Sequence, residues 1–164
     1  EMGTEPFLVA SSMVGIMAQR LVRVLCPHCT VPTTISTDEL AELGVSPARL
    51  EARFTHRSHP AYMVDNSQFE PLRRTGTAMG RKKVGCPQCL QTGYLGRSGI
   101  YELLLITDRV RGLVNQRADS TAIKRAGVDE GMETLRDDGL RKVLLGVTTA
   151  DEVLRATEQD IDEG

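Results

Sequence analysis

The 164-residue sequence contains no tryptophan, and only 4% of its residues are aromatic. A hydrophobic core must therefore come from aliphatic side chains, and a chain this small benefits from an additional cross-link or metal. The sequence has no apolar run approaching 18 residues and no basic, signal-like start, so we expect a cytosolic protein. The formal charge of -2 and a pI near 6.0 argue against a general nucleic-acid-binding protein.

Motifs for phosphate binding and hydrolysis are also missing. The stretch "GRKKVG" at 80–85 lacks both the spacing and the final Lys-Ser/Thr of a phosphate-binding loop. The glycine-rich "GYLGRSG" at 93–99 precedes an expected strand instead of opening a helix, which indicates a tight turn. Neither a His-Glu-x-x-His nor a Gly-x-Ser-x-Gly motif occurs. We therefore predict that these 164 residues catalyse nothing by themselves.

Four cysteines in two Cys-x-x-Cys pairs are the strongest chemical signal. They are Cys26 and Cys29 in "LCPHCT", and Cys86 and Cys89 in "GCPQCL". Four thiolates suit tetrahedral Zn²⁺, and a complete set of protein ligands leaves no position for water, so the predicted zinc is structural. The long separation weakens this interpretation little, because doubling a closed loop costs about 0.6 kcal/mol. A structural zinc site contributes about 10–16 kcal/mol.

Two other interpretations of the cysteines remain open. A thiol oxidoreductase shares the Cys-x-x-Cys spacing. A zinc-ribbon module that binds nucleic acid or a protein client would suit the Cys-Pro-x-Cys turns and the basic segment 49–83, which holds eight Lys/Arg against three acids. His28, His56 and His59 could replace a thiolate, but we expect ordinary surface histidines.

Polar groups near the cysteines are expected to support the charge of a tetrathiolate centre. Backbone amides can donate hydrogen bonds to sulfur, and nearby cations can offset the net charge of -2. The candidate cations are Arg23, Arg81, Lys82 and Lys83.

Periodicity predicts a mainly helical chain with one small β element. A helix over 6–25 runs directly into Cys26, and residues 99–106 form the best candidate strand. Capping boxes at Ser36/Glu39 and at Thr149/Glu152 mark two helix starts. Asp137 and Asp138 are expected on a solvated helix face. The remaining expected elements are helices over 46–54, 108–116, 121–126, 131–146 and 150–158, with an irregular insertion over 55–80.

Three stretches carry a family resemblance. They are "EPFLVASSMVGIMAQRLVRVLCPHC", "GCPQCLQTGYLGRSGIYELLLIT" and "LRDDGLRKVLLGVTTADEVLRAT". Together they resemble the C-terminal part of the type II secretion ATPases, the general secretion pathway protein E branch, and more distantly the type IV pilus assembly ATPases. The resemblance covers about 1–35 and 84–157.

This resemblance implies a cytoplasmic homo-hexameric motor that uses ATP and magnesium to drive pseudopilus assembly. Such a motor works at the inner face of the inner membrane through platform proteins and binds no nucleic acid. In this family the four cysteines hold zinc in a small subdomain, while the phosphate-binding loop lies upstream. Arg97, in "GRSG", matches the family's arginine after the second pair, and it is a candidate contact to a neighbouring subunit or to nucleotide.

The resemblance also implies a division of the chain. Residues 1–25 are expected to be the last helix of a RecA-like ATPase core, and 26–105 the tetracysteine zinc subdomain with its insertion. Residues 106–158 form a C-terminal helical subdomain, and 159–164 an acidic tail. The chain is thus expected to be a fragment of a longer motor.

Overall fold

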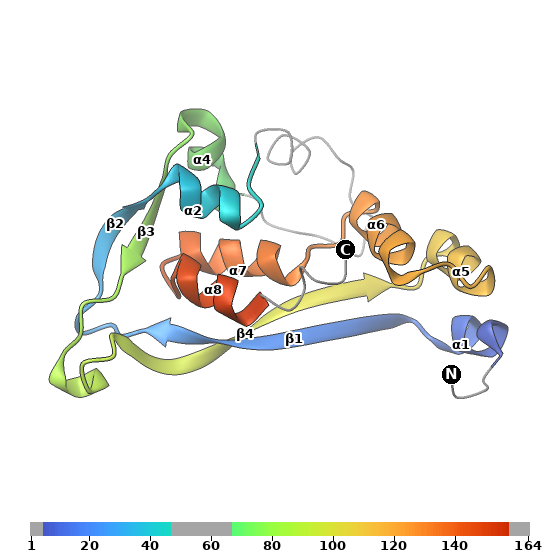
Figure 1. Ribbon diagram of the computed structural model, residues 1–164, viewed down its shortest axis with the longest axis horizontal. Helices are drawn as coiled ribbons and strands as arrows, with labels where there is room; N and C mark the ends of the chain where they lie inside the picture. Colours follow the sequence, from blue (N-terminus) through green and yellow to red (C-terminus); the bar gives the residue numbers. More distant parts are fainter. Residues whose placement is uncertain (1–4, 47–66, 158–164) are drawn as a thin grey trace.

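The computed structural model describes residues 5–46 and 67–157. Two antiparallel strand pairs support a layer of helices (Figure 1). The long pair, called the ribbon below, joins β1 (Gly15–Leu25) to β4 (Tyr94–Leu105), and the short pair joins β2 (Val31–Ile35) to β3 (Ala78–Lys82). The helices are α1 (Pro6–Ser12), α2 (Thr37–Glu42), α4 (Glu70–Thr75), α5 (Asp108–Asn115), α6 (Ser120–Asp129), α7 (Leu135–Leu144) and α8 (Ala150–Thr157), with short 3₁₀ turns η1 (Ser67–Phe69) and η2 (Pro87–Cys89).

The predicted helix over 6–25 is wrong beyond Ser12. Residues 15–25 form strand β1, which pairs with β4 from Gly15 opposite Leu105 to Leu25 opposite Tyr94. Long-range pairing with β4 overrides the helical spacing of the apolar residues, and the β-branched Val22 and Val24 favour a strand. The mainly helical class with a small β component is confirmed.

The irregular insertion predicted over 55–80 needs a partial correction. Its described part, from Ser67 onward, contains η1, α4 and the start of β3. Helix α4 ends at Gly76 with φ 67°, a left-handed conformation that suits glycine. The rest of the insertion and the expected helix over 46–54 lie almost wholly outside the described residues.

The other predicted helices form, but the one expected over 131–146 spans only Leu135–Leu144. The capping box expected at Thr149/Glu152 is not completed, because the Glu152 carboxylate bonds to Arg23 and Arg155 instead. Ser36 and Glu39 form the reciprocal capping box of α2, and Thr107 caps α5. The predicted strand over 99–106 is confirmed but begins earlier, at Tyr94. Helix α6 is longer than the predicted 121–126: it begins at Ser120, after its cap Asp119, and ends at Asp129.

The main core lies where α7 and α8 pack between the ribbon and the short strand pair (Figure 1). Val22 and Ile100 contribute from the ribbon, and Leu140, Val143 and Val153 from the two helices. A second, smaller cluster joins α5 and α6 around Val110 and Ala126. None of the helices in the described part of the chain combines the length and the apolar composition of a membrane span.

The outer edge of β4 is covered by side chains of α7. The Asp138 carboxylate accepts a hydrogen bond from the Tyr101 amide at 3.0 Å, and the Lys142 ammonium donates one to the Gly99 carbonyl. Asp138 also pairs with Lys142. The expectation of a solvated face for Asp137 and Asp138 is therefore wrong: Asp137 is buried and completes the capping box of α7 with Thr134.

The outer edge of β1 is different along its first seven residues. Every residue from Gly15 to Leu21 is exposed, including Ile16, Met17 and Leu21. In the part of the chain that the structure describes, no side chain or backbone group bonds to this stretch of edge. The edge is covered only further on, from Arg23 to Leu25.

Candidate metal centre

The two Cys-x-x-Cys turns meet at the end of the ribbon. All four sulfur atoms lie within 4.8 Å of one another, although Cys26 and Cys86 are 60 residues apart. The Sγ–Sγ distances are 3.8 Å for Cys26–Cys86, 3.9 Å for Cys29–Cys89 and 3.7 Å for Cys86–Cys89. A tetrahedron with Zn–S bonds of about 2.3 Å requires sulfur separations of about 3.8 Å. The cluster, called the metal clasp below, therefore fits zinc.

The spacing also separates the metal interpretation from disulfide chemistry. All four cysteines are free, and the sulfur separations are far longer than the roughly 2.05 Å of a disulfide bond. Cys26 and Cys89 are buried, while Cys29 and Cys86 are partly exposed. A redox pair needs an accessible, reactive thiol. A dithiol redox centre needs only one such pair, whereas here all four sulfurs converge within 4.8 Å, and this favours metal ligation.

Local backbone geometry forms each turn of the clasp. The Cys26 carbonyl accepts hydrogen bonds from the amides of Cys29 and Thr30, and the Cys86 carbonyl from those of Cys89 and Gln91. Leu90 and Gln91 both adopt left-handed conformations, with φ of 53° and 63°. Such conformations are unfavourable for non-glycine residues, so the turn stores strain at this site.

Backbone amides point at the sulfur atoms, as predicted. The Gly85 amide donates to Cys29 Sγ at 3.3 Å, and the amides of Cys86 and Gly93 donate to Cys89 Sγ at 3.3 and 3.2 Å. Gly93 has φ 75°, and a Cβ there would lie 2.4 Å from Lys83 Cβ. Only glycine can therefore bring this amide to the sulfur without displacing its neighbour.

The sulfur environments differ in their effect on ionisation. Burial raises the pKa of the Cys26 thiol to about 11. Burial also opposes ionisation of Cys89, but hydrogen bonds from the Cys86 and Gly93 amides and from the Cys86 and Cys29 thiols together lower the pKa of that thiol to about 6. Cys89 is thus the sulfur best prepared to bind a cation as thiolate, and a bound cation would displace the protons of the others.

The clasp is fastened to the end of β1 and to the C-terminal helices. The Cys26 amide donates to the Gly93 carbonyl at 2.9 Å, which joins the two turns. The Leu25 amide donates to the Val147 carbonyl at 2.8 Å, and the Thr148 hydroxyl donates to the Arg23 carbonyl at 2.8 Å. The loop between α7 and α8 therefore continues the hydrogen bonding of β1 up to the first ligand.

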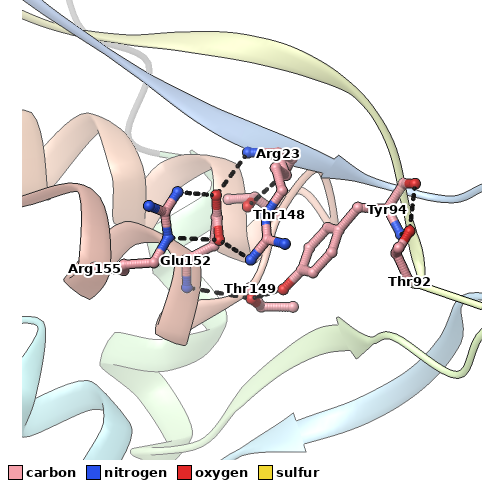
Figure 2. Close-up of polar contacts among 7 residues, drawn as sticks. All are labelled: Arg23, Thr92, Tyr94, Thr148, Thr149, Glu152 and Arg155. Atoms are coloured by element: carbon pink, nitrogen blue, oxygen red, sulfur yellow. Dashed lines mark hydrogen bonds and ion pairs between the residues drawn. The ribbon is translucent and has the colours of Figure 1, made fainter.

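A buried carboxylate lies beside this junction (Figure 2). Glu152, on α8, is only 1% exposed and accepts hydrogen bonds from the amide and the guanidinium of Arg23 at 3.1 and 2.6 Å. Arg155 donates to the same carboxylate at 2.7 and 3.2 Å. Burial alone would raise the pKa of Glu152, but the two arginines outweigh it and lower the pKa to about 2.

Tyr94 links this carboxylate network to the second turn of the clasp. The Arg23 guanidinium lies 4.3 Å from the centre of the Tyr94 ring, and the Tyr94 hydroxyl lies 2.8 Å from Thr149 Oγ1 (Figure 2). Tyr94 directly follows Gly93, whose amide contacts Cys89. Neither Tyr94 nor Glu152 is recognisable as part of this site from the sequence, where Glu152 is readable only as a helix cap.

The predicted supporting cations take other roles. Arg23 pairs with Glu152, Arg81 bonds to Thr30, and Lys83 lies 5.2 Å from the centre of the Tyr94 ring. Among the described residues, none of the four candidate cations, including Lys82, donates a hydrogen bond to a sulfur.

The remaining candidates lie away from the sulfurs or outside the described residues. Arg97 is exposed and lies directly opposite Arg23 in the ribbon. His28 is exposed, which fits the expected surface histidine. His56 and His59 lie outside the described residues.

Comparison with known proteins identifies relatives of the whole chain. It is 41% identical to the type II secretion system protein E of Pseudomonas aeruginosa over 98% of its length, and 36% identical to the type II secretion system ATPase E of Vibrio cholerae over 97%. It is also 36% identical to the type IV pilus assembly ATPase PilB of Thermus thermophilus over 96% of its length.

The chain spans only part of these relatives. It covers 26% of the length of the Pseudomonas and Vibrio proteins and 15% of the Thermus protein. The family described as "Type II/IV secretion system protein" matches residues 1–155. A match over nearly the whole sequence, together with these relatives, shows that the chain belongs to the type II/IV secretion system protein family.

Proposed function

We propose that this chain is the zinc-binding C-terminal part of an ATPase that powers type II protein secretion. The observation that carries the proposal is the group of four sulfurs, drawn from two distant turns to the separations that tetrahedral zinc requires. Cys26, Cys29, Cys86 and Cys89 would hold the metal. Four protein ligands complete its coordination, so zinc would stabilise the fold and would not act in hydrolysis.

The complete motor would supply the chemistry that these residues lack. We propose that it binds ATP and magnesium upstream of the present sequence, assembles as a hexamer in the cytoplasm and acts on inner-membrane platform proteins. Relatives named as ATPases support this assignment. The open edge and apolar side chains of β1 from Gly15 to Leu21 would pack against the rest of a RecA-like core.

Metal analysis of the purified chain tests the zinc assignment. We expect one zinc per chain, lost when Cys29 or Cys86 is replaced by serine. A metal-free wild-type chain would overturn the assignment. The intact protein should hydrolyse ATP while these 164 residues alone should not, and hydrolysis by the 164 residues would contradict the proposed division of labour.

Arg97 is proposed to contact a neighbouring subunit or bound nucleotide in the assembled motor. Its exposure and its position opposite Arg23, which is already paired with Glu152, leave its guanidinium available for carboxylate or phosphate. Arg97→Ala in the intact protein should reduce ATP hydrolysis or hexamer formation, with Arg97→Lys retaining part of the function. Unchanged hydrolysis and assembly would reduce Arg97 to a residue of the turn.

A further inference from the structure

Glu152 joins two distant parts of the chain, α8 and the end of β1, at one buried point. It lies on α8, its oxygens receive the backbone amide and guanidinium of Arg23 on β1, and Arg155 closes the remaining side. A charge at 1% exposure is retained only when its hydrogen-bonding capacity is filled. Breaking the contact to Arg23 therefore disturbs both β1 and α8.

The hydrogen-bonded end of β1 positions the first cysteine pair, Cys26 and Cys29. Arg23 is held through its amide, carbonyl and side chain, and Leu25 through its amide. Cys26 follows immediately, and its own amide bonds to Gly93. The position of Cys26 Sγ is thus set by a backbone segment that is hydrogen-bonded to α8 and to the loop before it.

Tyr94 connects the second cysteine pair, Cys86 and Cys89, to the same region of α8. The ring of this buried residue packs under the Arg23 guanidinium, and its hydroxyl meets Thr149 at the start of α8. Thr92 bonds to the carbonyls of both Cys89 and Tyr94. Both halves of the clasp are therefore positioned by contacts to the first turn of α8, although no side chain of α8 contacts a sulfur.

We propose that Glu152 is a positioning residue for the metal clasp, so that metal binding and the docking of α8 on β1 are energetically coupled. The inference deepens the proposed function and rests on the zinc assignment. Groups that orient metal ligands without touching the metal alter affinity by about 10–100-fold when they are replaced. Coupling between two equilibria is reciprocal, so the metal must also strengthen the docking of α8.

Zinc affinity of the intact chain provides the first test. Glu152→Gln preserves the shape of the side chain but removes the charge that orients Arg23, and we expect zinc to bind about 10-fold more weakly or worse. Tyr94→Phe, which loses only the contact to Thr149, should have a smaller effect in the same direction. Competition with a chromogenic chelator measures both.

Asp137→Asn is the matched control. Asp137 is also a buried carboxylate with a structural role: it accepts hydrogen bonds from the amide and hydroxyl of Thr134 and so caps the start of α7. Its replacement should lower stability while leaving zinc affinity within about twofold of wild type. A general loss of stability would affect both variants, whereas a positioning role affects only Glu152→Gln.

Hydrogen exchange of the zinc-saturated proteins is the second test. In Glu152→Gln we expect faster exchange at the amides of Leu25, Cys26 and Gly93, with no change near Val110 in the separate α5–α6 cluster. Unchanged zinc affinity in Glu152→Gln would overturn the inference while leaving the zinc assignment intact. A wild-type chain that binds no zinc would instead overturn the proposed function itself.

Discussion

The two outer edges of the ribbon have the same backbone geometry but different cover. Along β4, Asp138 and Lys142 from α7 bond to the backbone groups that face away from β1. Along β1, α8 and the preceding loop cover only the stretch next to the clasp, and residues 15–21 remain open. Unpaired edges invite pairing with another chain, and charged side chains are a common means of preventing it.

The edge of β4 and the end of β1 are thus covered within this chain, whereas residues 15–21 of β1 are not covered. The covered edge is held by Asp138 and Lys142 and the covered end by Glu152; each of these charged groups is buried or half-buried and has more than one partner. The open stretch instead exposes apolar side chains, among them Met17 at 62% and Leu21 at 51%. Such a surface suits a stretch that another part of a larger assembly covers.

Removing one metal ligand should have the largest effect, because it destabilises the clasp at the covered end of β1. Cys29→Ser leaves three thiolates, and we expect loss of zinc together with more than about 4 kcal/mol of stability, the scale at which loss of a metal is felt. Metal analysis and urea unfolding measure the two effects. Retention of stoichiometric zinc with an unchanged unfolding midpoint would contradict the assignment of this ligand.

Removing the carboxylate at the same end should have the next largest effect. Glu152→Ala breaks a buried pair and should cost about 3 kcal/mol, at the lower end of the usual range because both arginines retain access to water. Asp129→Asn, which breaks the exposed pair with Arg109, is the control and should cost less than about 1 kcal/mol. Equal losses in urea unfolding would show that burial does not matter here.

The Glu152 carboxylate also gives stability a pH dependence with a definite sign. The pKa of Glu152 is lowered to about 2 in the fold, against about 4.3 in an unfolded chain. Its stabilisation is therefore fully present above about pH 4.3 and is lost as the pH falls toward 2. The difference in unfolding free energy between wild type and Glu152→Gln should be constant from pH 6 to 8, and a marked change in that interval would disprove the low pKa.

Opening the edge of β4 should make the two edges alike. Asp138→Ala leaves the Tyr101 amide and the Lys142 ammonium without this acceptor, which should cost about 2 kcal/mol. A second open edge should also promote association that depends on protein concentration. Sedimentation at several concentrations measures it, and a variant that stays as wild type would mean that Asp138 does not protect this edge.

A charge on the open edge should have the smallest effect on the isolated chain. Met17→Lys replaces an exposed side chain, so the unfolding free energy should change by no more than about 0.5 kcal/mol. In the intact motor the same change should reduce assembly, because we propose that this surface is covered there. A large loss of stability in the isolated chain would show that β1 already has a partner.

Local signals in the sequence predicted local structure well. The capping box of α2 needs only Ser36 and Glu39, which lie three residues apart in one turn, and it forms as expected. The turns around the cysteines are equally local, and the chemistry of four thiolates sufficed to predict that the two pairs come together. These features depend on residues close in sequence or on a strong, specific ligand preference.

Features that depend on distant partners were missed. The stretch before Cys26 fits helical spacing, and only its pairing with β4 makes it a strand. Glu152 shows the same limit. The Glu152 amide does donate a hydrogen bond to Thr149, but the Glu152 carboxylate pairs with Arg23, 129 residues away, instead of completing the cap. No periodic pattern in the sequence reports such a partner.

The long separation between the two turns of the clasp has a consequence for folding kinetics. Contacts between residues far apart in sequence form slowly, because the entropy of loop closure must be overcome first. Once Cys26 and Cys86 meet across their 60 residues, each further rung of the ribbon closes only a small additional loop. We therefore expect zipping from the cysteines toward Gly15, with zinc accelerating refolding in stopped-flow experiments and substitutions at the distal rungs changing mainly the unfolding rate.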